Sequence, residues 1–163
     1  MGVFSFLKNA GAKIFGKDND EAAAKAAAAR DKAAAENLER QRGVALRSVI
    51  DATGIPIQNM DLDVAGDRAT IYGQVQEQAD KEKLILALGN VEGIATVDDR
   101  LKVVTPAPEA DFYEVKSGDS LSKIAKQFYG DPMKYPQIFE ANKPMLKDPD
   151  KIYPGQKLRI PKL

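Results

Sequence analysis

The chain has 163 residues, and its 24 Lys and Arg side chains balance 24 Asp and Glu side chains, so its formal net charge is zero. This balance provides no basic field for binding nucleic acid. Cysteine and histidine are both absent, which excludes disulfides, thiol nucleophiles, imidazole bases and the usual zinc or copper ligands, so we expect no transition metal. The length suits one ordinary domain or two small ones.

Residues 1–17 form an amphipathic segment with helical spacing. Its apolar residues, which lie near one helical face, are Val3, Phe4, Leu7, Ala10, Ile14 and Phe15. Lysines at positions 8, 13 and 17 break the apolar stretch, which falls short of the about seven residues in the core of a secretory signal. No run approaches the about 18 apolar residues of a membrane span, and Phe6 replaces the Ser or Thr of a myristoylation pattern. We therefore expect a cytoplasmic protein with no membrane span.

Residues 18–41 are rich in alanine, the residue with the highest helix propensity. Glu21 precedes Lys25 by four residues, which stabilises a helix further. Because large apolar side chains are scarce there, we interpret this stretch as a helical linker.

Residues 42–104 switch between helical and strand periodicity. A helical stripe comes first, made by Val44, Leu46, Val49 and Ile50. It ends at Thr53 and Gly54, and a hairpin that turns at 65–68, a helix over 77–89 and a strand over 96–104 follow. The order αββαβ occupies about 60 residues, a size at which a domain is only marginally stable.

Three features of this block resemble the BON domain family. They are Gly73 late in the second strand, the apolar helix after it, and the run GNVEGIATVDD at residues 89–99. In that run, Asp98 and Asp99 stand where the family usually places Asn or Asp.

Residues 105–111 contain two prolines and predict an extended hinge. The region 112–163 then predicts a strand, two helices and a strand. The first helix has a core face of Leu121, Ile124, Ala125 and Phe128, and Asp119 or Ser120 can cap it. Tyr135, Ile138 and Phe139 line the second helix, and we interpret Asn142 as a hydrogen-bonding cap at its end.

This region resembles the LysM family along its whole length. The predicted fold class is therefore α+β, with a BON domain of order αββαβ followed by a LysM domain of order βααβ. The resemblance implies a carbohydrate groove between the turn at 118–121 and the segment 145–153. The glycan-binding residues would be Gly118, Asp119, Ser120, Leu121, Lys151, Ile152 and Tyr153.

Catalysis is not expected, since no nucleophile elbow, phosphate loop or dinucleotide fingerprint is present. No pair of carboxylates stands in an apolar setting that would raise a pKa, as a glycosidase requires.

The combination of domains resembles a bacterial family of small cytoplasmic potassium-binding proteins. The likeness is strongest at 87–103 and 138–161, and it lapses at about residues 18–40. It implies that K⁺, or the larger Rb⁺ or Cs⁺, lies between the N-terminal segment and the loop 89–94. The backbone carbonyls that would bind the ion belong to Leu7, Ala10, Gly89, Val91, Gly93 and Ile94.

Elementary ion chemistry allows this site, because proteins select K⁺ with carbonyl dipoles, whereas Ca²⁺ and Mg²⁺ prefer carboxylates. A plain helix-to-strand connection is the alternative, since glycine-rich connections are common.

Three functions therefore stay open. The first is a monomer that senses or buffers K⁺, with LysM docked on BON. The second is a glycan-binding protein of the cell envelope, and the third is a non-catalytic adaptor that binds other proteins through LysM.

Overall fold

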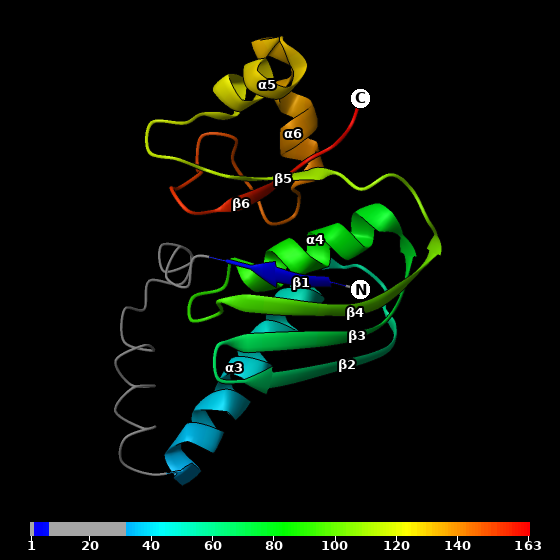
Figure 1. The fold of residues 1–163 in the computed structure, drawn as a ribbon, viewed down its shortest axis with the longest axis vertical. Coiled ribbons are helices and arrows are strands. Elements are labelled where there is room, and N and C mark those ends of the chain that lie inside the picture. The colour runs from blue at the N-terminus through cyan, green and yellow to red at the C-terminus, as the bar shows by residue number, and fades with distance from the viewer. Residues whose placement is uncertain (1, 7–31) are drawn as a thin grey trace.

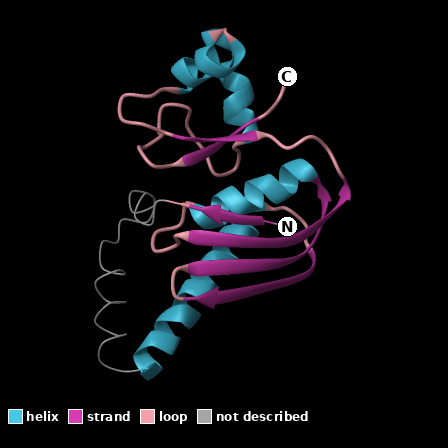
Figure 2. Ribbon diagram, viewed as in Figure 1, coloured by secondary structure: helices cyan, strands magenta, loops and turns pink. Residues whose placement is uncertain are grey.

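The computed structural model describes residues 2–6 and 32–163. They form a sheet layer with two helices on one face, and a smaller unit that lies against the outer side of one of these helices (Figures 1 and 2). The larger unit consists of β1 (Gly2–Ser5), α3 (Lys32–Thr53), β2 (Gln58–Ala65), β3 (Arg68–Glu77), α4 (Gln78–Gly89) and β4 (Thr96–Thr105). The smaller unit consists of β5 (Asp111–Glu114), α5 (Leu121–Tyr129), the 3₁₀ helix η1 (Pro132–Lys134), α6 (Tyr135–Ala141) and β6 (Lys157–Ile160).

The sheet of the larger unit has the order β1-β4-β3-β2. Strands β2 and β3 form the expected antiparallel hairpin, and α4 connects β3 to the parallel strand β4. The αββαβ order is confirmed. The buried core comprises Phe6, Leu46, Ile50, Ala69, Ile71, Val75, Leu84, Ile85, Leu86, Leu88, Ile94, Val97 and Leu101.

The beginning of the chain is a strand, and the prediction of a helical face there is wrong for residues 2–5. Strand β1 pairs antiparallel with β4, from Gly2 opposite Asp99 to Ser5 opposite Thr96. The edge of β4 supplies the hydrogen bonds that four residues could not supply within a helix of their own. Phe6, directly after the strand, is buried in the core. The rest of the predicted amphipathic segment lies outside the described residues.

Helix α3 is continuous across the predicted boundary between the linker and the BON domain at residues 41 and 42. Leu46 and Ile50 of the predicted stripe are buried, but Val44 is 66 % exposed and does not belong to the core. The predicted end of the helix is confirmed. The Thr53 hydroxyl donates to the Ile50 carbonyl at 2.6 Å, and Gly54 has a φ of +69°, which glycine adopts readily.

The smaller unit has the predicted βααβ order. Its core comprises Val115, Leu121, Ile124, Ala125, Ile138, Leu146, Leu158 and Ile160. Of the two predicted caps, Ser120 caps α5 by accepting from the Lys123 amide. Phe128, predicted as core, is instead 36 % exposed, and its ring meets the edge of Tyr113 at 5.6 Å between centroids.

Asn142 does more than end the second helix. Its amide nitrogen donates to the Ile138 carbonyl at 2.7 Å and to the Arg159 carbonyl at 2.8 Å. Its amide oxygen accepts from the Arg159 N–H at 2.6 Å. The buried side chain therefore joins α6 to β6, which a local cap would not do.

Among the helices of the described ranges, none is both long and apolar enough to cross a membrane.

Candidate functional site

The loop that follows α4 is the centre of the candidate site. The Asn90 N–H donates to the Leu86 carbonyl at 3.0 Å, and the Ile94 N–H donates to the Val91 carbonyl at 3.2 Å. Gly93 has a φ of +87°, a conformation that a side chain would strain. Within residues 2–6 and 32–163, no hydrogen bond reaches the carbonyls of Gly89, Gly93 or Ile94. These oxygens are therefore available to a ligand from the part of the loop that the structure describes.

Phe6 closes one side of this loop. Its N–H donates to the Ala95 carbonyl at 2.7 Å, and its ring lies directly on Gly89. A Cβ atom added at Gly89 would lie only 2.0 Å from Cζ of Phe6. Because position 89 has no side chain, the Phe6 ring can pack against it, and the end of the N-terminal strand lies beside the loop. The two predicted ligands that follow Phe6, Leu7 and Ala10, lie outside the described residues.

Arg42 of α3 closes the other side. Its guanidinium donates from Nη1 to the Gly66 carbonyl at 2.7 Å. The group also lies on Gly93, where an added Cβ would be 3.1 Å from Nη2 and 3.4 Å from Cζ and Nε. Arg42 is only 9 % exposed, and its Nε and Nη2 have no hydrogen-bond partner. A charged group with two unpaired donors is thus buried at the candidate site, an arrangement that costs stability.

The outer face of α4 carries the contact with the smaller unit. Gln78, Glu82, Leu86 and Asn90 follow each other at intervals of four residues, so they share one face, and all are buried. The Asn90 amide pairs with the backbone of β6, donating to the Lys157 carbonyl and accepting from the Lys157 N–H, both at 3.0 Å. Asn90 therefore continues the hydrogen bonding of the small sheet into the candidate loop.

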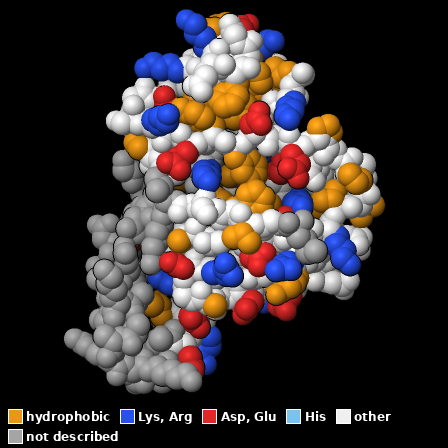
Figure 3. All heavy atoms as spheres, viewed as in Figure 1, with side chains coloured by type: hydrophobic (Ala, Val, Ile, Leu, Met, Phe, Trp, Pro, Cys, Tyr) orange, Lys and Arg blue, Asp and Glu red, His pale blue; other side chains and the backbone are white. Residues whose placement is uncertain are grey.

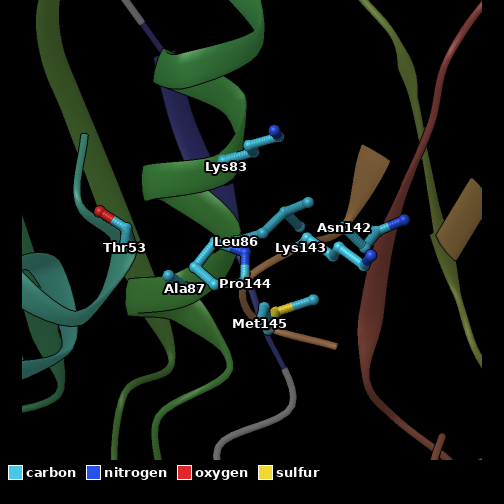
Figure 4. Close-up of a pocket in the computed structure, with 8 residues that line it drawn as sticks. All are labelled: Thr53, Lys83, Leu86, Ala87, Asn142, Lys143, Pro144 and Met145. Atoms are coloured by element: carbon cyan, nitrogen blue, oxygen red, sulfur yellow. The ribbon is translucent and has the colours of Figure 1, made fainter. Parts of the chain in front are cut away.

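At the other end of this face, Arg159 of β6 forms a salt bridge with Glu82. The Glu82 side chain is only 4 % exposed, and it also accepts from the Ala110 N–H of the predicted hinge at 3.0 Å. Between the two polar contacts, Pro144 and Met145 face Leu86 and Ala87 (Figure 4). The contact is therefore apolar at its centre and polar at both ends.

Lys157 adds a further link to the N-terminal strand. Its ammonium donates to the Ser5 carbonyl and lies 5.1 Å from the centroid of the Phe6 ring. Phe112 of β5 contacts Phe4 at 5.6 Å between ring centroids. The smaller unit thus touches β1, α4 and the candidate loop together.

The predicted glycan-binding residues differ in their exposure to solvent. Gly118 and Lys151 are exposed, whereas Leu121 and Tyr153 are 2 % and 7 % exposed and face the interior. Asp119 accepts from the Tyr113 hydroxyl at 2.7 Å and from the Lys116 N–H at 2.9 Å. These hydrogen bonds lower the pKa of the Asp119 carboxyl. Burial raises the pKa of the Tyr153 hydroxyl, which has no hydrogen-bond partner.

Basic and acidic side chains alternate over the visible face of the molecule, without a large area of one sign (Figure 3). Within the ranges that the structure describes, no three acidic, histidine or cysteine side chains gather as metal ligands would. The available donors at the candidate loop are carbonyl oxygens.

Four residues of this site were not identified from the sequence pattern: Phe6, Arg42, Asn90 and Lys157. Arg42 and Lys157 look like ordinary surface charges, and Asn90 looks like a turn residue. A signal did exist for the docking face, because the run from Leu84 to Leu88 is apolar on all sides of its helix. Such a helix is normally buried all round.

Comparisons with known proteins agree with this architecture. The BON domain family model matches residues 37–105, and the LysM domain family model matches residues 113–161. The potassium binding protein Kbp of Escherichia coli O6:H1 is 44 % identical over 162 residues, which cover 99 % of this chain and 99 % of that protein. An uncharacterized protein of Deinococcus radiodurans is 36 % identical over 130 residues, which cover 72 % of this chain and 50 % of that protein.

Proposed function

Because the chain belongs to the family of the potassium binding protein Kbp, we propose that it binds K⁺ and senses or buffers this ion in the cytoplasm. The same site would accept the larger ions Rb⁺ and Cs⁺. The ligands would be the backbone carbonyls of Leu7, Ala10, Gly89, Val91, Gly93 and Ile94.

The observation that carries this proposal is the set of loop carbonyls without hydrogen-bond donors. Gly89, Gly93 and Ile94 each offer such an oxygen within the described part of the chain, and the Val91 carbonyl keeps a second lone pair beside its bond from Ile94. Carbonyl oxygens are suitable ligands for K⁺ because their dipoles replace its hydration shell in protein sites.

Ion binding would stabilise the arrangement that supplies all the ligands at once. The N-terminal strand would be held against the loop by Phe6, and the LysM domain would be held against it by Asn90. A ligand that binds only the ordered state stabilises that state by about 2.7 kcal/mol at a hundredfold excess over Kd.

Thermal unfolding in KCl and in NaCl at matched ionic strength tests this function. We expect a higher midpoint in KCl, and equal midpoints would contradict K⁺ binding. Gly93→Ala and Gly118→Ala are matched in backbone strain, because the two glycines have φ values of +87° and +85°. They differ in that the added Cβ meets the Arg42 guanidinium at position 93 and open space at position 118. Only Gly93→Ala should lose the difference between the two salts, since Gly118 belongs to the LysM domain, in the turn between β5 and α5.

Glycan binding by the LysM domain is a second candidate. The observation in its favour is that Gly118 and Lys151, one from each side of the predicted groove, are both exposed. Sedimentation with purified peptidoglycan tests it. Retention that Lys151→Ala weakens would support the glycan function, and no retention of the wild-type protein would contradict it.

A further inference from the structure

The candidate loop lies beside a charge that a simple carbonyl site would not need. Backbone carbonyls also bind Ca²⁺, and the attraction of a carbonyl dipole to a divalent ion is twice its attraction to a monovalent ion at the same place. Carbonyl oxygens alone therefore do not exclude divalent ions.

Arg42 lies directly beside this loop, since a Cβ placed on Gly93 would be 3.1–3.4 Å from its guanidinium. The guanidinium keeps its charge at every physiological pH, and its 9 % exposure limits screening by solvent. It is fixed in position by the hydrogen bond from Nη1 to the Gly66 carbonyl. Two of its nitrogens have no acceptor, so hydrogen bonding alone does not account for burying this charge here.

We propose that Arg42 determines the charge selectivity of the site by excluding divalent cations from the loop 89–94. This inference rests on the proposed binding of K⁺. Repulsion from a fixed positive charge is proportional to the charge of the ion. Arg42 therefore weakens the binding of a divalent ion by the square of the factor by which it weakens the binding of K⁺.

Ba²⁺ is the appropriate probe because its ionic radius is close to that of K⁺, so size contributes little to the comparison. Isothermal titration calorimetry of the full chain with KCl and with BaCl₂ would give both affinities, in a buffer free of sulfate and phosphate and at constant ionic strength set with choline chloride. Removing the charge in Arg42→Gln should tighten K⁺ binding by a factor on the order of ten and Ba²⁺ binding by a factor on the order of a hundred.

Two variants separate charge from structure. Arg42→Lys keeps the charge and should retain the wild-type ratio of K⁺ to Ba²⁺ affinity. Arg40→Gln removes a positive charge from an exposed position of the same helix, where solvent screens it, and it should leave the ratio unchanged. If circular dichroism shows that Arg42→Gln is unfolded, Arg42→Met provides a second neutral side chain with a similar stem.

The outcomes are distinguishable. If the ratio of K⁺ to Ba²⁺ affinity in the neutral variants equals that of the wild-type protein, Arg42 does not determine charge selectivity, although the protein still binds K⁺. A wild-type protein that does not respond to KCl would overturn the proposed function, and this inference with it. Divalent binding that appears in Arg42→Gln but not in Arg42→Lys would support the proposal.

Discussion

Replacing Gly89 by alanine tests whether Phe6 fixes the N-terminal strand to the candidate loop. The added Cβ would lie 2.0 to 2.2 Å from three atoms of the Phe6 ring, far inside contact distance, so the ring must leave its position. Burial of a Phe side chain is worth about 1.5–3 kcal/mol. Alanine in place of glycine within a helix returns about 0.5–1 kcal/mol. The net loss should therefore be about 0.5–2.5 kcal/mol.

Urea unfolding followed by circular dichroism would measure this loss, and the Phe6→Ala background provides the control. Without the ring, alanine at position 89 meets no obstacle and should stabilise the protein by its helix propensity. The sign of the effect should thus reverse between the two backgrounds, with a coupling free energy of about 1.5–3 kcal/mol. The same destabilisation by Gly89→Ala in both backgrounds would refute the contact between Phe6 and Gly89.

Three further predictions concern the contacts of the LysM domain. Asn90→Ala leaves the Lys157 N–H without its acceptor, so the amide of Lys157 should exchange with deuterium faster while the amides of α5 keep their protection. Arg159→Met leaves the buried Glu82 carboxylate without its cation and should lower the free energy of unfolding in urea by about 3 kcal/mol. Arg47→Met breaks the exposed pair with Asp61 at 3.7 Å and should lower it by less than about 1 kcal/mol. The pKa of Asp119 is lower in the folded state than in the unfolded state. Ionised Asp119 therefore contributes fully to the free energy of unfolding above its unfolded pKa of about 4. This contribution is lost as the pH falls through the folded pKa. Tyr113→Phe should reduce the slope of the thermal midpoint against pH in that acid range, and an unchanged slope would contradict the role of the Tyr113 hydroxyl.

Periodicity predicted most elements of both domains because the information was local. The stripe Leu121, Ile124 and Ala125 is buried at its predicted helical spacing, and Ala69, Ile71 and Val75 are buried at strand spacing. The glycines that end α3 and α5 have the positive φ values expected of helix ends, +69° at Gly54 and +73° at Gly130.

The errors concern what tertiary structure decides rather than local sequence. Residues 2–5 form a strand only because β4 offers its edge, and no local pattern in them shows this. Val44 follows the helical spacing of its stripe, but the structure leaves it 66 % exposed. Phe128 fits a core position by spacing, yet its ring contacts Tyr113 at the surface.

The candidate site was predictable only in outline. Carbonyl ligands leave almost no side-chain pattern, so Gly89 and Gly93 indicated an irregular loop and the family resemblance indicated its use. Arg42 escaped prediction because its position depends on Gly66 and Gly93, which the fold brings to it. Asn90 escaped because its partner, Lys157, is 67 residues away in the chain.

The position of the loop at the end of α4 has a consequence for how the two domains depend on each other. Leu84, Ile85 and Leu88 of this helix lie in the core of the BON domain, and Glu82 and Asn90 hold the LysM domain. Domains of this size are individually marginal, because too little of their surface is buried. Each therefore gains stability through α4, and the last turn of that helix leads directly into the candidate ligands. An ion bound there would stabilise the element that both domains share, so its effect would reach the LysM domain even though that domain contributes no ligand.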